Sequence, residues 1–122
     1  MKYSLTIFIP KVTKSNNLSL RTNAFKRNKE NKQWYDLIAF HTNGKRPEKP
    51  LSAVKITLVR RGKKYLDYDN LVASFKPVVD GLIRSKILKD DSYEITGSWE
   101  VYQLKRSPHT TEGICISVED IS

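Results

Sequence analysis

Residues 67–91 read DYDNLVASFKPVVDGLIRSKILKDD, a stretch that combines one amphipathic helix with acidic residues on both of its sides. The helix is predicted to start at Asp69 or Asn70, both good N-cap residues, and to run to about Lys86. Pro77 lacks a backbone donor, which predicts a kink near Ala73. Apolar residues recur at helical spacing and predict one stripe that packs on a sheet: Leu71, Phe75, Val78, Val79 and Leu82.

The segments on either side of this helix show the two-residue alternation of β-strands. Four strands are predicted, at residues 2–9, 52–61, 93–105 and 113–121, with the last two forming a hairpin-like pair around Ser107-Pro108. A first helix is predicted from about Ala24 to Thr42, and its inner face carries Trp34, Leu37, Ile38 and His41. The order βαβαββ indicates an α/β (α+β) fold, a small mixed sheet with helices packed on it, in a single domain over residues 1–122.

The charge of the chain limits its partners. Its 122 residues include 22 Lys and Arg against 13 Asp and Glu, a formal net charge of +9. This excess predicts a polyanionic partner, with an anionic membrane surface as the competing possibility. A spanning helix is not expected, since no apolar run approaches the ~20 residues it requires. The one cysteine, Cys115, sits in an alternating strand and predicts a packing role in a reducing, cytoplasmic environment.

Acidic residues are scarce in this chain, yet they gather around the second helix. Asp67 and Asp69 lie at its start and Asp90-Asp91 in the turn that follows it. Close-set carboxylates repel one another unless a cation or a proton lies between them, and hard oxygen ligands suit Mg²⁺ or Mn²⁺. Helical spacing puts Lys76 and Asp80 on the face of Asp69. The alternative is that these acids only cap the helix and form exposed turns.

The acidic pattern resembles the RusA-type Holliday junction resolvases. The resemblance rests on three segments: Asp67-Tyr68-Asp69-Asn70-Leu71, Lys76-Pro77-Val78-Val79-Asp80-Gly81-Leu82 and Asp90-Asp91-Ser92. More loosely, it extends to Asn16-Asn17 and a basic helix ending in Lys32-Gln33-Trp34. Members of this family are small, homodimeric, Mg²⁺-dependent endonucleases, mostly of phage or prophage origin. The resemblance covers roughly residues 15–98.

The resemblance implies roles for particular residues. The catalytic residues would be Asp67, Asp69, Asp91 and Lys76. Mg²⁺, or Mn²⁺ in its place, would be held by Asp67, Asp69 and Asp91, with Asp90 in support. Asn70 and Asp80 would also support the site. One branch of the family carries its catalytic lysine about a turn nearer the Asp-Asn pair. Ala73 occupies that position here, so Lys76 is the helix candidate.

The implied activity is a structure-specific DNA endonuclease that resolves Holliday junctions in recombination and repair by phosphodiester hydrolysis. Symmetric cutting of a four-way junction requires two active sites, which predicts a C2 homodimer. Two alternatives remain. One is another metal-dependent nuclease acting on flaps or RNA, and the other is a basic nucleic-acid-binding module without catalysis.

Basic runs flank the acidic residues and are predicted to contact phosphates. They comprise Lys26, Arg27, Lys29 and Lys32; then Arg60, Arg61, Lys63 and Lys64; then Arg84, Lys86 and Lys89. His41 is predicted to pack and His109 to lie in an exposed loop. The aromatic residues Trp34, Trp99 and Tyr102 are expected in the core or a dimer interface, whereas Tyr68 lies between two proposed ligands and could meet DNA.

Overall fold

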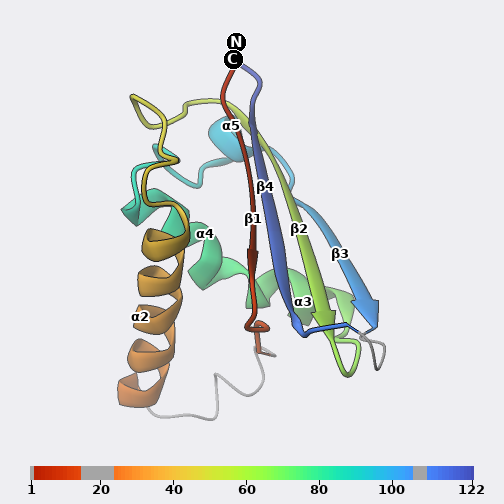
Figure 1. The fold of residues 1–122 in the computed structure, drawn as a ribbon. Coiled ribbons are helices and arrows are strands. Elements are labelled where there is room, and N and C mark those ends of the chain that lie inside the picture. Colours follow the sequence, from red (N-terminus) through yellow and green to blue (C-terminus); the bar gives the residue numbers. More distant parts are fainter. Residues whose placement is uncertain (1, 15–23, 106–109) are drawn as a thin grey trace.

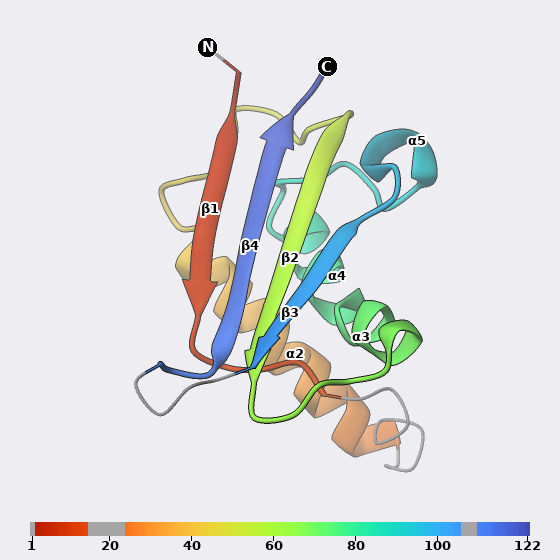
Figure 2. The ribbon, with the colours of Figure 1, turned by 90° about the vertical axis from the view of Figure 1, so that its right-hand side faces the viewer.

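The computed structural model describes residues 2–14, 24–105 and 110–122 (Figure 1). Its helices α2, α3 and α4 lie on one face of a four-stranded sheet, and the other face is open in Figure 2. The predicted mixed α/β class is therefore confirmed. In chain order the elements are β1 (Ser4–Ile9), α2 (Ala24–His41), β2 (Val54–Gly62), α3 (Tyr68–Ser74), α4 (Lys76–Arg84), α5 (Tyr93–Thr96), β3 (Glu100–Lys105) and β4 (Gly113–Asp120).

The strands lie in the order β1-β4-β2-β3. β4 runs antiparallel to both β1 and β2, and β3 runs parallel to β2 at the edge of the sheet. The prediction that the last two strands form a hairpin-like pair is wrong, since β2 separates β3 from β4. The predicted turn at Ser107-Pro108 lies outside the described residues.

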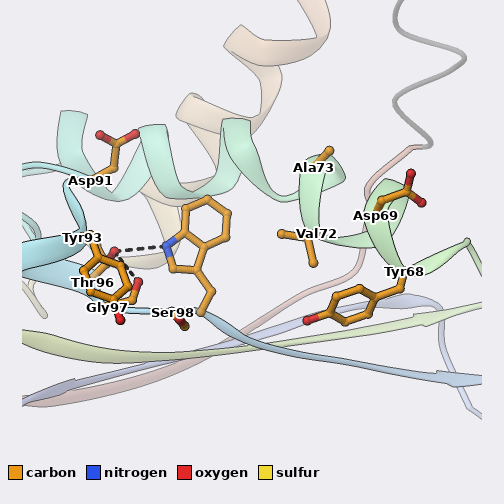
Figure 3. Close-up of a pocket in the computed structure, with 10 residues that line it drawn as sticks. Tyr68, Asp69, Val72, Ala73, Asp91, Tyr93, Thr96, Gly97 and Ser98 are labelled. Atoms are coloured by element: carbon orange, nitrogen blue, oxygen red, sulfur yellow. Dashed lines mark hydrogen bonds between the residues drawn. The ribbon is translucent and has the colours of Figure 1, made fainter.

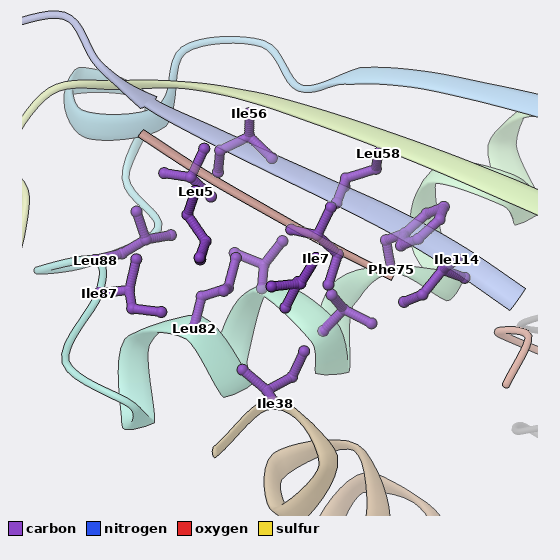
Figure 4. Close-up of a cluster of buried hydrophobic side chains, with 14 of the residues drawn as sticks. Leu5, Ile7, Ile38, Ile56, Leu58, Phe75, Leu82, Ile87, Leu88 and Ile114 are labelled. Carbon is purple, nitrogen blue, oxygen red and sulfur yellow. The ribbon is translucent and has the colours of Figure 1, made fainter. Parts of the chain in front are cut away.

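Alternation along the strands builds the core between the sheet and the helices (Figure 4). Leu5, Ile7 and Ile9 of β1 point inward, as do Val54, Ile56 and Leu58 of β2. Each such side chain contributes about 1.5–3 kcal/mol when fully buried.

Helix α2 meets this core through Trp34 and Ile38, both buried as predicted, with Leu37 and His41 partly buried beside them. Helices α2 and α4 pack closely: a Cβ placed on Gly81 of α4 would lie 3.0 Å from Cγ1 of Ile38 on α2.

The single kinked helix predicted after Asp69 is two helices. Phe75 interrupts it, and Pro77 lies in the first turn of α4, where a missing N–H leaves no hydrogen bond unmade. The break therefore falls at Phe75 rather than at Ala73. The helix also begins earlier than predicted, because α3 starts at Tyr68 and Asp67 occupies the N-cap position.

The predicted strand over residues 93–105 is shorter than expected. Its first part is the helical turn α5, and the strand begins only at Glu100. Gly97 lies between them with a φ of 57°, a backbone conformation that glycine adopts at little cost and that ends α5. Within the described part of the chain, no helix has the length and apolarity to cross a membrane.

Candidate functional site

An open pocket of about 680 Å³ lies between α3, α5 and the segment that leads into β3. Asp69 of α3 and Asp91, from the segment before α5, both line it, although they are far apart in the sequence. Figure 3 shows these two carboxylates toward opposite ends of the pocket. Three aromatic residues also line the pocket: Tyr68, Tyr93 and Trp99.

The backbone that leads into α3 is fixed by one side chain of the edge strand. Gln103 of β3 donates from Nε2 to the carbonyl of Leu66 at 2.8 Å, and its Oε1 accepts from the N–H of Leu66 at 3.0 Å. This pair of bonds sets the position of Asp67, the next residue. The carboxylate of Asp67 makes no cap hydrogen bond, and Asp69 accepts one from the N–H of Asn70 at 3.0 Å. Both carboxylates are exposed.

Buried polar groups hold α3 from the inside. Ser74 Oγ lies 2.8 Å from Thr13 Oγ1 and 2.7 Å from the carbonyl oxygen of Leu71. Arg60 donates from Nε to the carbonyl of Thr13 at 2.9 Å and from a terminal nitrogen to the carbonyl of Lys64 at 3.0 Å. Burial lowers the pKa of the Arg60 guanidinium, and the charge of Glu112 opposes that change. Arg60 thus joins β2 to the segments on both sides of it.

The second acidic segment is held by a short backbone bridge. The N–H of Leu51 donates to the carbonyl of Ile87 at 2.8 Å, and the N–H of Lys89 donates to the carbonyl of Leu51 at 3.0 Å. The chain then reaches Asp90, whose carboxylate accepts a 2.6 Å hydrogen bond from the N–H of Asp91.

Lys76 links α4 to this acidic segment. Its ammonium pairs with Asp80, one turn along the helix, at 3.1 Å, and also with Asp91. The hydrogen bond with Asp91 is the main cause of a raised pKa of Lys76, and the same bond lowers the pKa of Asp91. The structure therefore brings Lys76, Asp80 and Asp91 together, with Asp69 at the other end of the pocket.

The predicted metal ligands come from two separate segments, residues 67–69 and 90–91. Across residues 2–14, 24–105 and 110–122, no group of three or more His, Cys, Asp or Glu is placed to hold a metal ion. Asp67, Asp69, Asp90 and Asp91 are thus not gathered into one cluster. The donor chemistry still fits, since Mg²⁺ binds one or two carboxylates and completes its shell with water and phosphate oxygens. Asp67 and Asp69 both present exposed carboxylates, and that of Asp69 lines the pocket, whereas the carboxylate of Asp91 is paired with Lys76.

The basic residues predicted to contact phosphates lie in different settings. Arg60 is the exception to the prediction, because it is 8% exposed and its donors are used inside the protein. Arg84 stacks its guanidinium over the ring of Tyr35 at 4.3 Å, and Lys32 pairs with Asp36 at 3.0 Å. The other side chains are exposed or, for Arg61, half-buried: Lys26, Arg27, Lys29, Arg61, Lys63, Lys64, Lys86 and Lys89.

Several residues that build the pocket are missing from the predicted site. Trp99, predicted in the core or an interface, is half-buried in the pocket wall and donates from Nε1 to Oγ1 of the buried Thr96 at 3.3 Å. No sequence signal marks Gln103 as an anchor. His41 is half-buried with its ring against that of Phe40, whereas His109 and Asn16-Asn17 lie outside the described residues.

A scan against models of known protein families finds no match, and a search of curated proteins finds none either. The family expectation therefore rests on the sequence motifs.

Proposed function

We propose that this protein is a Mg²⁺-dependent endonuclease that hydrolyses phosphodiester bonds in branched DNA, with the four-way Holliday junction as its substrate. One observation carries the proposal: Asp69 and Asp91, from separate segments, line a single open pocket in a chain of net charge +9. A nuclease needs acidic groups at its centre and positive charge around them, because phosphates would otherwise be repelled.

The residues take the following roles in this proposal. Asp67 and Asp69 would hold the cation through their exposed carboxylates. When bound, Mg²⁺ lowers the pKa of a water ligand and neutralises charge on the phosphate. Lys76 holds the carboxylate of Asp91 in place through their ion pair, and Asp80 holds Lys76. Lys63 and Lys64, exposed in the loop before α3, attract the phosphate backbone.

The resemblance to RusA-type resolvases supports the choice of substrate and assembly. Cutting two strands symmetrically requires two pockets, so the proposed form is a C2 homodimer acting in the cytoplasm. Mn²⁺ is proposed to replace Mg²⁺, since both are hard cations that accept carboxylate and water oxygens.

The test is incubation of the purified protein with a labelled four-way junction, in Mg²⁺ or in EDTA, beside flap, linear and RNA substrates. Asp69→Asn keeps an acceptor for the N–H of Asn70 while it removes the charge. We expect cleavage to fall by at least ~10³ in this variant, reflecting several kcal/mol of lost cation assistance. The matched control is Asp36→Asn, which changes an exposed carboxylate on α2 that is paired with Lys32. Cleavage by Asp69→Asn at the wild-type rate would refute the proposed site.

A second function, a basic nucleic-acid-binding module without catalysis, is favoured by one observation. Asp91 is neutralised by Lys76, and the described carboxylates form no group of three. A module of this kind binds junctions equally in Mg²⁺ and EDTA and cleaves none of the substrates. The same incubation therefore separates the two functions.

A further inference from the structure

The pocket between α3, α5 and the segment that leads into β3 combines aromatic walls with an acidic group at each end. Figure 3 shows Tyr68 on the side of Asp69, and Tyr93 on the side of Asp91. These two tyrosines are 69% and 77% exposed. The volume of about 680 Å³ lies within the range of roughly 300–1,000 Å³ that is typical of small-molecule pockets. Trp99 and several aliphatic or small residues line the rest: Val72, Ala73, Gly97 and Ser98.

The indole of Trp99 is held in one orientation by the protein behind it. Its Nε1 donates to Oγ1 of Thr96 at 3.3 Å, and Thr96 is 3% exposed. The same hydroxyl lies 3.0 Å from the carbonyl oxygen of Gly97 and 3.3 Å from that of Ser92, which fixes its own position. Trp99 also packs against the hydrophobic core and stays half-buried. A ring anchored in this way loses little freedom when a ligand stacks on it.

The charges of the pocket favour a neutral, planar ligand. Among the described residues that line it, two are acidic and none is basic, in a chain of net charge +9. A phosphate or carboxylate inside the pocket would therefore be repelled unless a cation entered with it. A nucleobase is neutral, its faces stack on aromatic rings, and the N–H groups at its edge donate to carboxylates such as those of Asp69 and Asp91.

Positive charge lies outside the pocket, where it can hold the phosphates of a strand. Lys63 and Lys64 are exposed in the loop before α3, and Lys89 is exposed before the second acidic segment. A strand bound by these lysines can turn one base into the pocket. Bases in a duplex cover one another by stacking, so the ring of Trp99 is accessible only to a base that has left the stack. Unstacking costs least in unpaired or single-stranded DNA.

We propose that this pocket binds one unstacked nucleobase of the DNA strand, stacked on Trp99 and Tyr93. These two residues then determine specificity, because they favour strands that offer an unpaired base near the acidic groups. This inference rests on the proposed function for its choice of DNA. It concerns the base, however, whereas the proposed Mg²⁺ chemistry concerns the phosphate.

The first experiment measures binding in EDTA, so that no cleavage takes part, to two labelled single strands of equal length. One is oligothymidylate, and the other is the same sugar-phosphate chain without bases. Electrostatic attraction is common to both, since they carry the same phosphates. The wild-type protein should bind oligothymidylate about 5- to 150-fold more tightly, the effect of stacking one base on an aromatic ring. Trp99→Leu should remove most of this preference, whereas Trp99→Phe, which keeps an aromatic face, should retain much of it.

Tyr93→Ala tests the same pocket through an exposed side chain, so it remains informative if Trp99→Leu does not fold. It should also reduce the preference for oligothymidylate. The matched control is Tyr102→Ala, which changes a tyrosine that is 54% exposed on β3 and does not line the pocket. This control should leave the preference unchanged. Circular dichroism establishes that each variant is folded.

Tryptophan fluorescence reports on the pocket directly. The chain contains two tryptophans, and Trp34 is 1% exposed, so a change on DNA binding is assigned to Trp99. Oligothymidylate should quench this emission, whereas the strand without bases should not. In Trp99→Phe, neither strand should change the emission of Trp34. Free thymidine at the same concentrations should not quench, because it lacks the phosphates that the lysines attract.

The outcomes separate this inference from the proposed function. Equal affinity of the wild-type protein for the two strands would overturn the inference, and so would a preference that survives in both Trp99→Leu and Tyr93→Ala. Free thymidine that binds as tightly as the strand would also overturn it. Base-dependent quenching by a protein that cleaves no substrate would support the pocket and refute the nuclease. Cleavage by a protein that binds both strands equally would refute the pocket alone.

Discussion

Replacing Arg60 by Met tests whether this arginine is a structural residue or part of the DNA-contact surface. The guanidinium is buried and donates to the carbonyls of Thr13 and Lys64. Methionine retains the apolar stem but supplies no donor. The change therefore removes the link between β2, the segment after β1 and the loop before α3, while it leaves the volume of the side chain largely filled.

The magnitude follows from the two hydrogen bonds. A bond from a charged donor contributes about 1.5–3 kcal/mol, and a buried acceptor left unpaired costs about 1–3 kcal/mol. In the variant, the buried carbonyl of Thr13 is left without a hydrogen bond, whereas the partly exposed carbonyl of Lys64 can accept one from water instead. We expect Arg60→Met to lower the free energy of unfolding by about 2–4 kcal/mol.

Urea denaturation followed by circular dichroism measures this loss, with Lys63→Met as the control in the exposed loop. The control should change the free energy of unfolding by no more than ~0.5 kcal/mol. In the folded protein, Arg60→Met should leave the salt dependence of junction binding unchanged. Equal stability of the two variants would refute the structural role. A weaker salt dependence of junction binding by Arg60→Met would show that Arg60 contacts DNA.

Three further predictions follow from the described contacts. Pairing lowers the pKa of Asp91 and raises that of Lys76. The ion pair therefore contributes fully to the free energy of unfolding between the ordinary pKa values of 3.8 and 10.5. The contribution is lost as pH falls through the lowered pKa of Asp91 or rises through the raised pKa of Lys76. Lys76→Met should therefore raise the Asp91 pKa measured by NMR. It should lower the free energy of unfolding by under ~1 kcal/mol at neutral pH, because these side chains are partly exposed. An unchanged Asp91 pKa would contradict the ion pair. Replacing Lys63 and Lys64 with Ala should reduce the slope of log affinity against log salt by up to about 2, and an unaltered slope places the DNA elsewhere. Gly81→Val should cost about 1–3 kcal/mol in urea denaturation because even a Cβ there presses on α2; wild-type stability would show that the helices can separate freely.

Sequence alternation predicts β1, β2 and β4 well and only the second half of the range predicted for β3, and it does not predict which strands are neighbours in the sheet. The even-numbered positions of β2 from Val54 onward face the helices, and this rule identifies the inward side because side chains alternate along any strand. The same period also puts Arg60 on the inward face, which is the signal that separates it from the rest of its basic run. Strand pairing depends on contacts between distant segments, so the sequence pattern does not reveal that β4 lies between β1 and β2.

In the candidate site, too, the local motifs are recognisable from the sequence, whereas the tertiary contacts are not. Residues 67–71 and 90–91 are recognisable as two acidic motifs, and the structure brings Asp69 and Asp91 to one pocket. Their orientation depends on Gln103 and on the partners of Lys76, which are tertiary contacts. Residues 93–96 include types common in strands, yet they form a helical turn that ends at Gly97, whose N–H donates to the carbonyl of Tyr93.

The central place of β4 has a consequence for synthesis on the ribosome. β1, β2 and β3 are all made before residues 113–120, but β1 has no neighbour in the sheet until β4 arrives. The nascent chain therefore carries β1 and one side of β2 as unpaired strand edges, which favour aggregation while they are exposed. The sheet closes when β4 enters between strands that are already formed, a late, long-range step that is expected to limit the rate of folding.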